Sequence, residues 1–160
     1  MCVVFLDIDG VLNNRLHLLG LVGLCRSDFR LMIDPEKVEL LNMILRATGA
    51  VIVVSSSWRH GRSLDELRMI LADRGLRGDV IDVTPDASVL KGPAPHGGWM
   101  RGHEIEAWLD AHPTHSEFVV LDDDDDMAGV QDHLIQTSFD DGLTLEHVEQ
   151  AIKVLGGRCG

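Results

Sequence analysis

The chain is poor in cysteine and in long apolar runs, and each shortage excludes a class of protein. Its three cysteines, Cys2, Cys25 and Cys159, are odd in number, widely separated and in no Cys-x-x-Cys pair. Neither a disulfide framework nor a zinc site is therefore expected. No run approaches the roughly 18 to 20 apolar residues that cross a bilayer. We expect a soluble protein without a membrane partner, in a reducing cytoplasm.

Positive charge is also scarce. The sequence has 14 lysines and arginines against 26 aspartates and glutamates, which gives a net charge of −12. This balance argues against a general electrostatic surface for nucleic acid, but a local basic groove remains compatible with it. Five of the acidic residues are consecutive, at 122–126, where a cation can offset them. Net charge therefore says little about the partner.

The chain also lacks internal repeats, low-complexity linkers and shifts in composition. With 160 residues, it is long enough for one domain with a substantial core and too short for two independent ones. Apolar residues make up 45% and charged residues 25%, close to the averages of globular domains. We expect a single domain over residues 1–160.

Short apolar runs rich in valine and isoleucine alternate with helical segments. Such runs are typical of buried parallel strands. They lie at residues 2–6, 50–54, 80–83 and 118–121, with 134–138 as a fifth candidate. Helices are expected between Asp34 and Gly49, from Ser63 to Gly75, at about 101–111, at about 127–133, and between Thr144 and Gly156. The alternation predicts an α/β fold with a Rossmann-like parallel sheet flanked by helices.

Two aspartates directly follow the first predicted strand. Asp7 and Asp9 precede Gly10, at the carboxyl end of a strand, where open α/β sheets place their ligands. The alternation Asp-Ile-Asp directs both carboxylates to one side, and Gly10 allows a sharp bend. Crowded carboxylates repel each other unless a cation or hydrogen bonds offset the charge, and Mg²⁺ prefers oxygen ligands. A solvated turn is the alternative interpretation of this motif taken alone.

Two further polar clusters follow predicted strands and can converge with the first. Residues 122–126 are the five aspartates, and residues 55–57 are three serines. Serine hydroxyls and free backbone N–H groups at a strand end are suitable donors to phosphate oxygens. An acidic run is otherwise a solvated face, which is the alternative for Asp124 and Asp125. We assign Trp58 to packing rather than to substrate stacking.

In this order the motifs resemble those of the haloacid dehalogenase (HAD) superfamily of phosphohydrolases. The resemblance is carried by Leu-Asp-Ile-Asp-Gly-Val at 6–11, by residue 55 and by the Asp-Asp pair at 122–123, which together span nearly the whole chain. The segments Ser-Ser-Ser-Trp-Arg (55–59) and Glu-Ile-Glu-Ala-Trp-Leu (104–109) are also similar to the small phosphatase domains of RNA-repair proteins. The 3′-phosphatase modules of polynucleotide kinases are similar to these domains.

The resemblance implies a magnesium-dependent phosphatase mechanism. Asp7 would be the nucleophile, which attacks phosphorus and forms an aspartyl-phosphate that water later hydrolyses. Asp9 would first protonate the leaving oxygen and then activate the water. Mg²⁺ would be held by the Asp7 carboxylate, the Asp9 carbonyl, and Asp122 or Asp123.

The same resemblance assigns other residues to the substrate phosphate. Ser55, with the Ser56 amide, is expected to bind a phosphoryl oxygen, and Gly10 is placed beside the phosphate. Arg59 follows the serines at the same sheet edge and is a candidate for a second phosphate contact. An ion pair at the end of a helix is the alternative for Arg59.

The superfamily also has a lysine shortly before its last acidic motif, and lysine is scarce here. Of Lys37, Lys91 and Lys153, only Lys91 lies in the right interval, well before the helix expected at 101–111. Arg101 begins that helix, and a guanidinium binds phosphate oxygens in a bidentate fork. We favour Arg101 over Lys91 as the phosphate-binding cation, with a surface charge as the alternative for each.

Neither interval between the motifs has room for the large cap domain of bigger superfamily members. Residues 13–33 can form only a flap and residues 84–100 only a loop. An uncapped site suits a phosphate presented on a large molecule, such as a nucleic-acid end or a protein. Together with this, the resemblance of segments 55–59 and 104–109 to RNA-repair phosphatase domains implies a phosphatase for 3′-phosphate ends of RNA or DNA. The candidates for a local basic groove are Arg15, Arg26, Arg30, Arg59 and Arg101.

Two other functions are compatible with the sequence. The same mechanism can act on a small phosphate monoester or nucleotide, and a non-catalytic module with this fold can bind a phosphorylated partner. Because Asp7 and Asp9 are both present, as nucleophile and acid, the sequence argues against a pure binder. Asp126 lies four positions after Asp122 and is a further candidate metal ligand.

Overall fold

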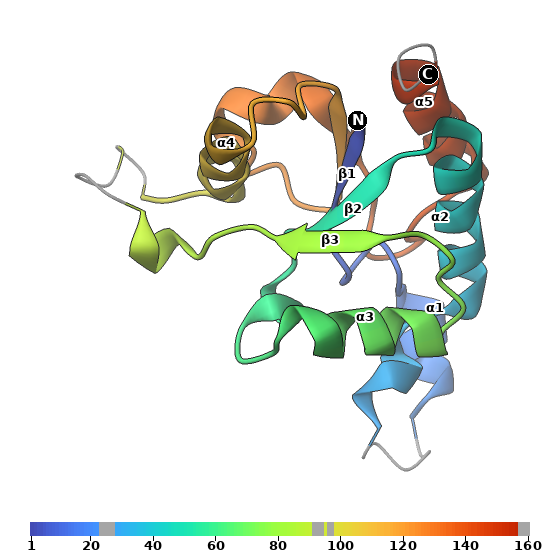
Figure 1. Cartoon of the computed structure of the whole chain (residues 1–160). Coiled ribbons are helices and arrows are strands. Elements are labelled where there is room, and N and C mark those ends of the chain that lie inside the picture. The colour runs from blue at the N-terminus through green and yellow to red at the C-terminus, as the bar shows by residue number, and fades with distance from the viewer. Residues whose placement is uncertain (23–27, 91–94, 96–97, 157–160) are drawn as a thin grey trace.

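A parallel sheet of five short strands forms the centre of the computed structural model, which describes residues 1–22, 28–90, 95 and 98–156 (Figure 1). The strand order is β3-β2-β1-β4-β5. The strands are Val3–Leu6 (β1), Val51–Val54 (β2), Val80–Val83 (β3), Phe118–Asp122 (β4) and Leu134–Gln136 (β5). All four strand pairs are parallel. The predicted α/β class and all five strands are therefore confirmed.

Helices cover both faces of the sheet, and no large cap is inserted among the described residues. The α-helices are Arg15–Gly20 (α1), Pro35–Thr48 (α2), Leu64–Asp73 (α3), Arg101–Ala111 (α4) and Leu145–Leu155 (α5). Short 3₁₀ helices are Phe29–Met32 (η1), Ser57–Arg59 (η2), Ala87–Val89 (η3) and Ala128–His133 (η4). Figure 1 shows α4 on one side of the sheet and α2 and α5 on the other. None of the described helices has the length and apolar character to span a membrane.

Each sheet face has its own apolar core. Val4 and Leu6 of β1 pack in a cluster with residues of α2, α3 and α5, whereas Val3 and Phe5 pack with Ile105 and Trp108 of α4. Side chains alternate between faces along a strand. Asp7, the residue after Leu6, is therefore directed to the side of α4. The residues that follow Val54 in β2 and Leu121 in β4 are directed to the same side.

The predicted helix ends are largely observed. The Asp34 side chain accepts a hydrogen bond from Glu36 N, and Gly49 ends α2 with φ of 65°, in the left-handed region that favours glycine. Ser63 and Glu66 form the expected capping box of α3. The caps confirm the two helix starts that the sequence marks most clearly.

Two local expectations were wrong. The segment expected to be a helix at about 127–133 is the 3₁₀ helix η4, whose first residue, Ala128, has a φ of 43°, a conformation that a regular α-helix does not contain. The segment 13–33, expected to lack regular structure, contains α1 and η1. Neither buries a residue, so no apolar periodicity marks them in the sequence.

Cys2 corrects the expectation that the cysteines are unpaired. It is buried and disulfide-bonded. Sequence spacing does not report the distance between sulfur atoms, which depends on the fold.

Gly102 provides a test of the packing between α4 and η4. A Cβ atom at this position would lie 1.8 Å from the backbone oxygen of Met127, so we expect Gly102→Ala to lower the free energy of unfolding by about 1 to 3 kcal/mol. Urea denaturation measures this change. Gly20→Ala is the matched control, because no atom lies within 4 Å of a Cβ there. Equal stability of the two variants would contradict the close contact.

Candidate active site

The residues that follow the strands stand in a row at the carboxyl edge of the sheet. Asp7 N donates to Leu121 O at 2.9 Å, Ser55 N to Leu6 O at 2.9 Å, and Thr84 N to Val54 O at 3.0 Å. These bonds continue the parallel pairing by one residue, so the side chains remain in strand alternation. The structure thus brings Asp7, Ser55 and Asp122 together on the face covered by α4.

Three carboxylates crowd at this edge. Asp7, Asp122 and Asp123 each offer an oxygen atom, and these atoms lie within 4.8 Å of one another. Burial raises the pKa of Asp7 to about 6, against the opposing effects of the Arg101 guanidinium and a hydrogen bond from Ser56. Burial and the Asp7 charge raise the pKa of Asp122 to about 7. Ionising this group is therefore costly without a cation.

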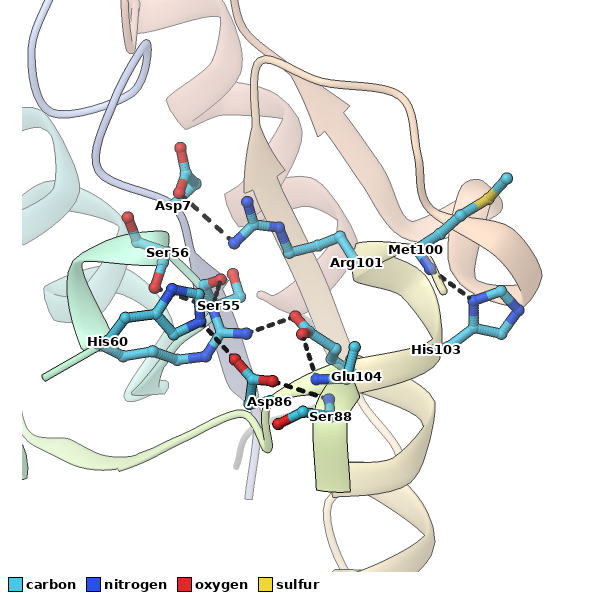
Figure 2. Close-up of polar contacts among 12 residues, drawn as sticks. Asp7, Ser55, Ser56, His60, Asp86, Ser88, Met100, Arg101, His103 and Glu104 are labelled. Carbon is cyan, nitrogen blue, oxygen red and sulfur yellow. Dashed lines mark hydrogen bonds and ion pairs between the residues drawn. The ribbon is translucent and has the colours of Figure 1, made fainter. Parts of the chain in front are cut away.

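Arg101, the first residue of α4, supplies a positive charge to this cluster. Its Nη1 lies 3.8 Å from Asp7 Oδ1 and its Nε lies 3.5 Å from Asp122 Oδ2. Figure 2 shows the guanidinium directed at Asp7, with Ser55 and Ser56 beside it. The backbone N–H of Arg101 donates to Asp126 Oδ2 at 3.2 Å. The second candidate cation, Lys91, lies outside the described residues.

Several buried polar atoms at this edge have no hydrogen-bond partner among the described residues. They are Ser55 Oγ, Thr84 Oγ1, Arg101 Nη1 and Asp122 Oδ2. A buried donor or acceptor without a partner is unfavourable. Two hydroxyls and a guanidinium are donors for a phosphoryl group, and a carboxylate oxygen is a ligand for a cation. The set matches an anionic substrate bound beside a metal ion.

The oxygen-only cluster fits Mg²⁺, a hard cation that takes carboxylate ligands. The Asp122 oxygen without a partner and the raised pKa values both indicate uncompensated negative charge. Asp123 also has a raised pKa, through burial and the neighbouring Asp124. Asp126 is not part of the carboxylate group, since its side chain receives the N–H of Arg101 at the start of α4.

Asp9 is held by two donors that the sequence did not indicate. Asn13 Nδ2 donates to Asp9 Oδ1 at 2.7 Å, and Trp58 Nε1 donates to Asp9 Oδ2 at 3.0 Å. Trp58 is buried, as expected for a packing residue, but its indole N–H also fixes the orientation of the Asp9 carboxylate. No spacing rule in the sequence connects residues 49 positions apart.

Gly10 shapes the loop and presents no free donor to a phosphate. Its N–H donates to Asn13 Oδ1 at 2.9 Å, and its carbonyl accepts from Thr137 Oγ1 at 2.7 Å. It adopts φ of 70°, and a Cβ atom would lie 2.3 Å from the Asp123 carboxyl carbon. A glycine is therefore required for close approach of the loop to Asp123. Its placement as a substrate-binding residue gains no support from these contacts.

Arg59 is likewise engaged by protein groups, and these contacts give no support to its assignment to the substrate phosphate. Its Nη1 donates to the carbonyls of Ser55 and Ser56, and its Nη2 contacts Glu104 Oε2 at 2.6 Å. Glu104 in turn accepts from Ala87 N at 2.9 Å. Only 8% of Arg59 is exposed. The structure thus shows an ion pair between Arg59 and Glu104, which connects the serine loop to α4.

Within the part of the chain that the structure describes, the remaining candidates for a basic groove are paired with carboxylates. Arg15 lies 3.5 Å from Asp140, and Arg30 is paired with Asp28 and Asp73. Arg26 lies outside the described residues. Sequence alone could not show the pairings with Asp140 and Asp73, because each joins residues far apart in the chain.

The titration of Asp122 yields a test in metal-free protein. A pKa raised from 3.8 to about 7 means that the folded state binds a proton more tightly than the unfolded state. The resulting stability is present at low pH and is lost as pH rises through about 7. We expect Asp122→Asn to become more stable relative to the unchanged protein between about pH 4 and pH 8, by on the order of 2 to 4 kcal/mol.

Chemical denaturation in EDTA at several pH values measures this difference. Asp125→Asn is the control, because that carboxylate is exposed and lies outside the cluster. A stability difference for Asp122→Asn that does not change with pH would contradict the raised pKa.

Comparison with known proteins gives one match, and it covers most of the chain. Residues 3–148 match the family model described as the HAD domain in Swiss Army Knife RNA repair proteins. No curated protein and no solved structure matches. The matched region contains every strand, the carboxylate cluster and Arg101. The chain therefore belongs to the family of HAD domains found in Swiss Army Knife RNA repair proteins.

Proposed function

We propose that this HAD domain is a Mg²⁺-dependent phosphomonoesterase that acts on 3′-phosphate ends of RNA or DNA through an aspartyl-phosphate intermediate. The main observation that supports this proposal is the position of Asp7. This buried carboxylate follows the central strand β1 and lies beside the Arg101 guanidinium, with Ser55 on the neighbouring strand end. Family membership supports phosphatase-type chemistry, and the RNA-repair context of the family supports a nucleic-acid substrate.

The proposed reaction has two steps. In the first, Asp7 forms a bond to phosphorus while the bond to the leaving oxygen breaks, and Asp9 donates a proton to that oxygen. In the second, a water attacks the aspartyl-phosphate and gives its proton to Asp9, which restores both carboxyl groups and releases phosphate. Asn13 and Trp58 hold Asp9 in place for both transfers.

The surrounding groups stabilise charge on the phosphoryl oxygens. The hydroxyl of Ser55, the Ser56 amide and the Arg101 guanidinium are the proposed donors, and a buried donor set costs no reorganisation during the reaction. Asp7, Asp122, Asp123 and the Asp9 carbonyl would hold Mg²⁺. When bound, this ion offsets the negative charge of the carboxylates and of the transferring phosphoryl group.

The absence of a cap among the described residues supports a large substrate. The described part of the segment after β1 contributes the six-residue helix α1 and the four-residue helix η1, which are too short to enclose a site as a domain does. Open sites receive a phosphate at the end of a polymer without having to enclose it.

Asp7→Asn tests the nucleophile. The amide is nearly the same size but is a poor nucleophile, so we expect kcat to fall by about 10³-fold or more with an unchanged far-ultraviolet circular dichroism spectrum. Phosphate release from a 3′-phosphorylated oligonucleotide in Mg²⁺ measures the rate. Asp125→Asn, an exposed neighbour of the cluster, is the control and should retain activity. Undiminished hydrolysis by Asp7→Asn would exclude the covalent mechanism.

The substrate is tested by a matched panel. It contains one oligonucleotide with a 3′-phosphate, the same oligonucleotide with a 5′-phosphate, free nucleotides and an aryl phosphate. The proposal expects the highest kcat/KM for the 3′-phosphate. Hydrolysis of only the small esters would identify a small-molecule phosphatase, and binding without hydrolysis of any member would identify a non-catalytic module.

Arg101→Ala tests the cation. Loss of the guanidinium beside Asp7 should lower kcat/KM by about 10²- to 10³-fold, whereas Arg101→Lys keeps a positive charge and should lose less. Arg15→Ala is the control, because Arg15 is exposed and pairs with Asp140. If Arg101→Ala retains full activity and Lys91→Ala does not, the cation is Lys91.

A further inference from the structure

A second group of side chains surrounds the far side of Trp58, and apart from the Trp58 indole N–H, which holds Asp9, the proposed chemistry does not use it. The Phe29 ring meets the Trp58 ring edge to face, with centroids 5.8 Å apart. The guanidinium carbon of Arg62 lies 4.5 Å from the Phe29 centroid and 5.5 Å from the Trp58 ring. The three side chains come from η1, from η2 and from the loop before α3. We call them the Phe29 platform.

The Phe29 platform opens onto a cavity of about 550 Å³. This volume lies within the range of small-molecule sites. Phe29 and Arg62 line it, together with Arg30, His60 and Met69. Phe29 is 39% exposed, so part of its ring is accessible from this cavity.

Arg62 is, with Arg30, one of the two arginines that line this cavity. Hydrogen bonds from Ser63 and, to a smaller extent, the charge of Arg62 lower the pKa of Glu66, an exposed carboxylate that also lines the cavity. Arg30 contacts Asp28 at 2.7 Å and Asp73 at 2.6 Å, so its charge is offset. Among the described residues, Arg62 forms no ion pair within 4 Å, and its Nη1 donates to the carbonyl of Trp58 at 2.9 Å. A positive guanidinium thus lies on an aromatic ring at the edge of a chain with a net charge of −12.

Trp58 connects the Phe29 platform directly to the proposed acid. Its indole N–H donates to Asp9 Oδ2 at 3.0 Å, while its ring contacts Phe29 and Arg62. Asp9 acts on the leaving oxygen in the proposed mechanism, so the platform stands on the leaving-group side of the site. In a nucleoside 3′-phosphate, one sugar ring separates the 3′ oxygen from the base.

We propose that the Phe29 platform binds the base of the nucleotide that carries the 3′-phosphate, by stacking against Phe29 and Arg62. The inference rests on the proposed function and adds a site for the leaving nucleoside. Aromatic rings and guanidinium planes are the groups on which proteins stack unpaired bases, and the positive charge also favours the adjacent phosphates. Stacking of this kind tolerates any base, because every base has a flat face.

The test compares two substrates of the same length in Mg²⁺. One is an oligonucleotide that ends in a normal nucleoside 3′-phosphate, and the other ends in an abasic sugar 3′-phosphate. We expect the unchanged protein to prefer the normal end in kcat/KM by about 5- to 100-fold. Phe29→Ala should remove this preference by slowing only the normal end, and Phe29→Tyr should preserve it. Arg62→Gln should reduce it in part.

The controls separate this site from the chemistry. Phe139→Ala replaces another phenylalanine, 46% exposed and outside the cavity, and should keep the preference. Hydrolysis of an aryl phosphate reports the chemical step in every variant. If the unchanged protein hydrolyses both ends at equal rates, the proposed base binding by the Phe29 platform is wrong. The proposed phosphatase function would not be affected by that result.

Two other outcomes also decide the matter. If Phe29→Ala slows the normal end, the abasic end and the aryl phosphate by the same factor, Phe29 only supports Trp58 and Asp9, and the platform is overturned. If the aryl phosphate is cleaved but neither oligonucleotide is, the nucleic-acid substrate and the platform both fail. Loss of the preference in Phe29→Ala with an unchanged aryl phosphatase rate supports the platform.

Discussion

Mutual repulsion among Asp7, Asp122 and Asp123 is the constraint on which the rest of this site depends. Their oxygens lie within 4.8 Å of one another at a buried sheet edge, where burial and like charge raise the pKa of Asp7 and Asp122. A protein tolerates such a group only with compensating charge. Arg101 provides part of it, at distances longer than a hydrogen bond. The arrangement is therefore electrostatically suited to receive a divalent cation and a phosphate together.

Several packing features serve to hold this crowded edge in place. The buried Arg59–Glu104 pair connects the serine loop to α4, and α4 carries Arg101. Gly102 allows α4 to approach the backbone after β4, where a side chain would collide with Met127 O. Asp126 receives the N–H at the first residue of the same helix. Asp126, the last residue of the aspartate run, thus helps to position Arg101 beside Asp122 and Asp123, the first two residues of the run.

Local patterns account for much of what could be predicted. The five valine- and isoleucine-rich runs became the five strands, and the caps at Asp34 and Ser63 were read correctly, because strand burial and helix capping depend on residues close in sequence. The helices α1 and η1 were missed because neither of them buries a side chain. Arg59 was assigned to the substrate because the sequence does not reveal its partner Glu104, 45 positions away.

The sequence by itself determined the fold class and the presence of Asp7, Ser55 and Asp122 at strand ends, since a strand boundary and a two-residue alternation are local properties. Only the tertiary structure decided how these groups are supported. Trp58 and Asn13 on Asp9, Arg101 between two carboxylates, and Arg62 over Phe29 are contacts whose distances depend on how the helices and loops pack around the sheet. Chain proximity and residue type do not determine that packing.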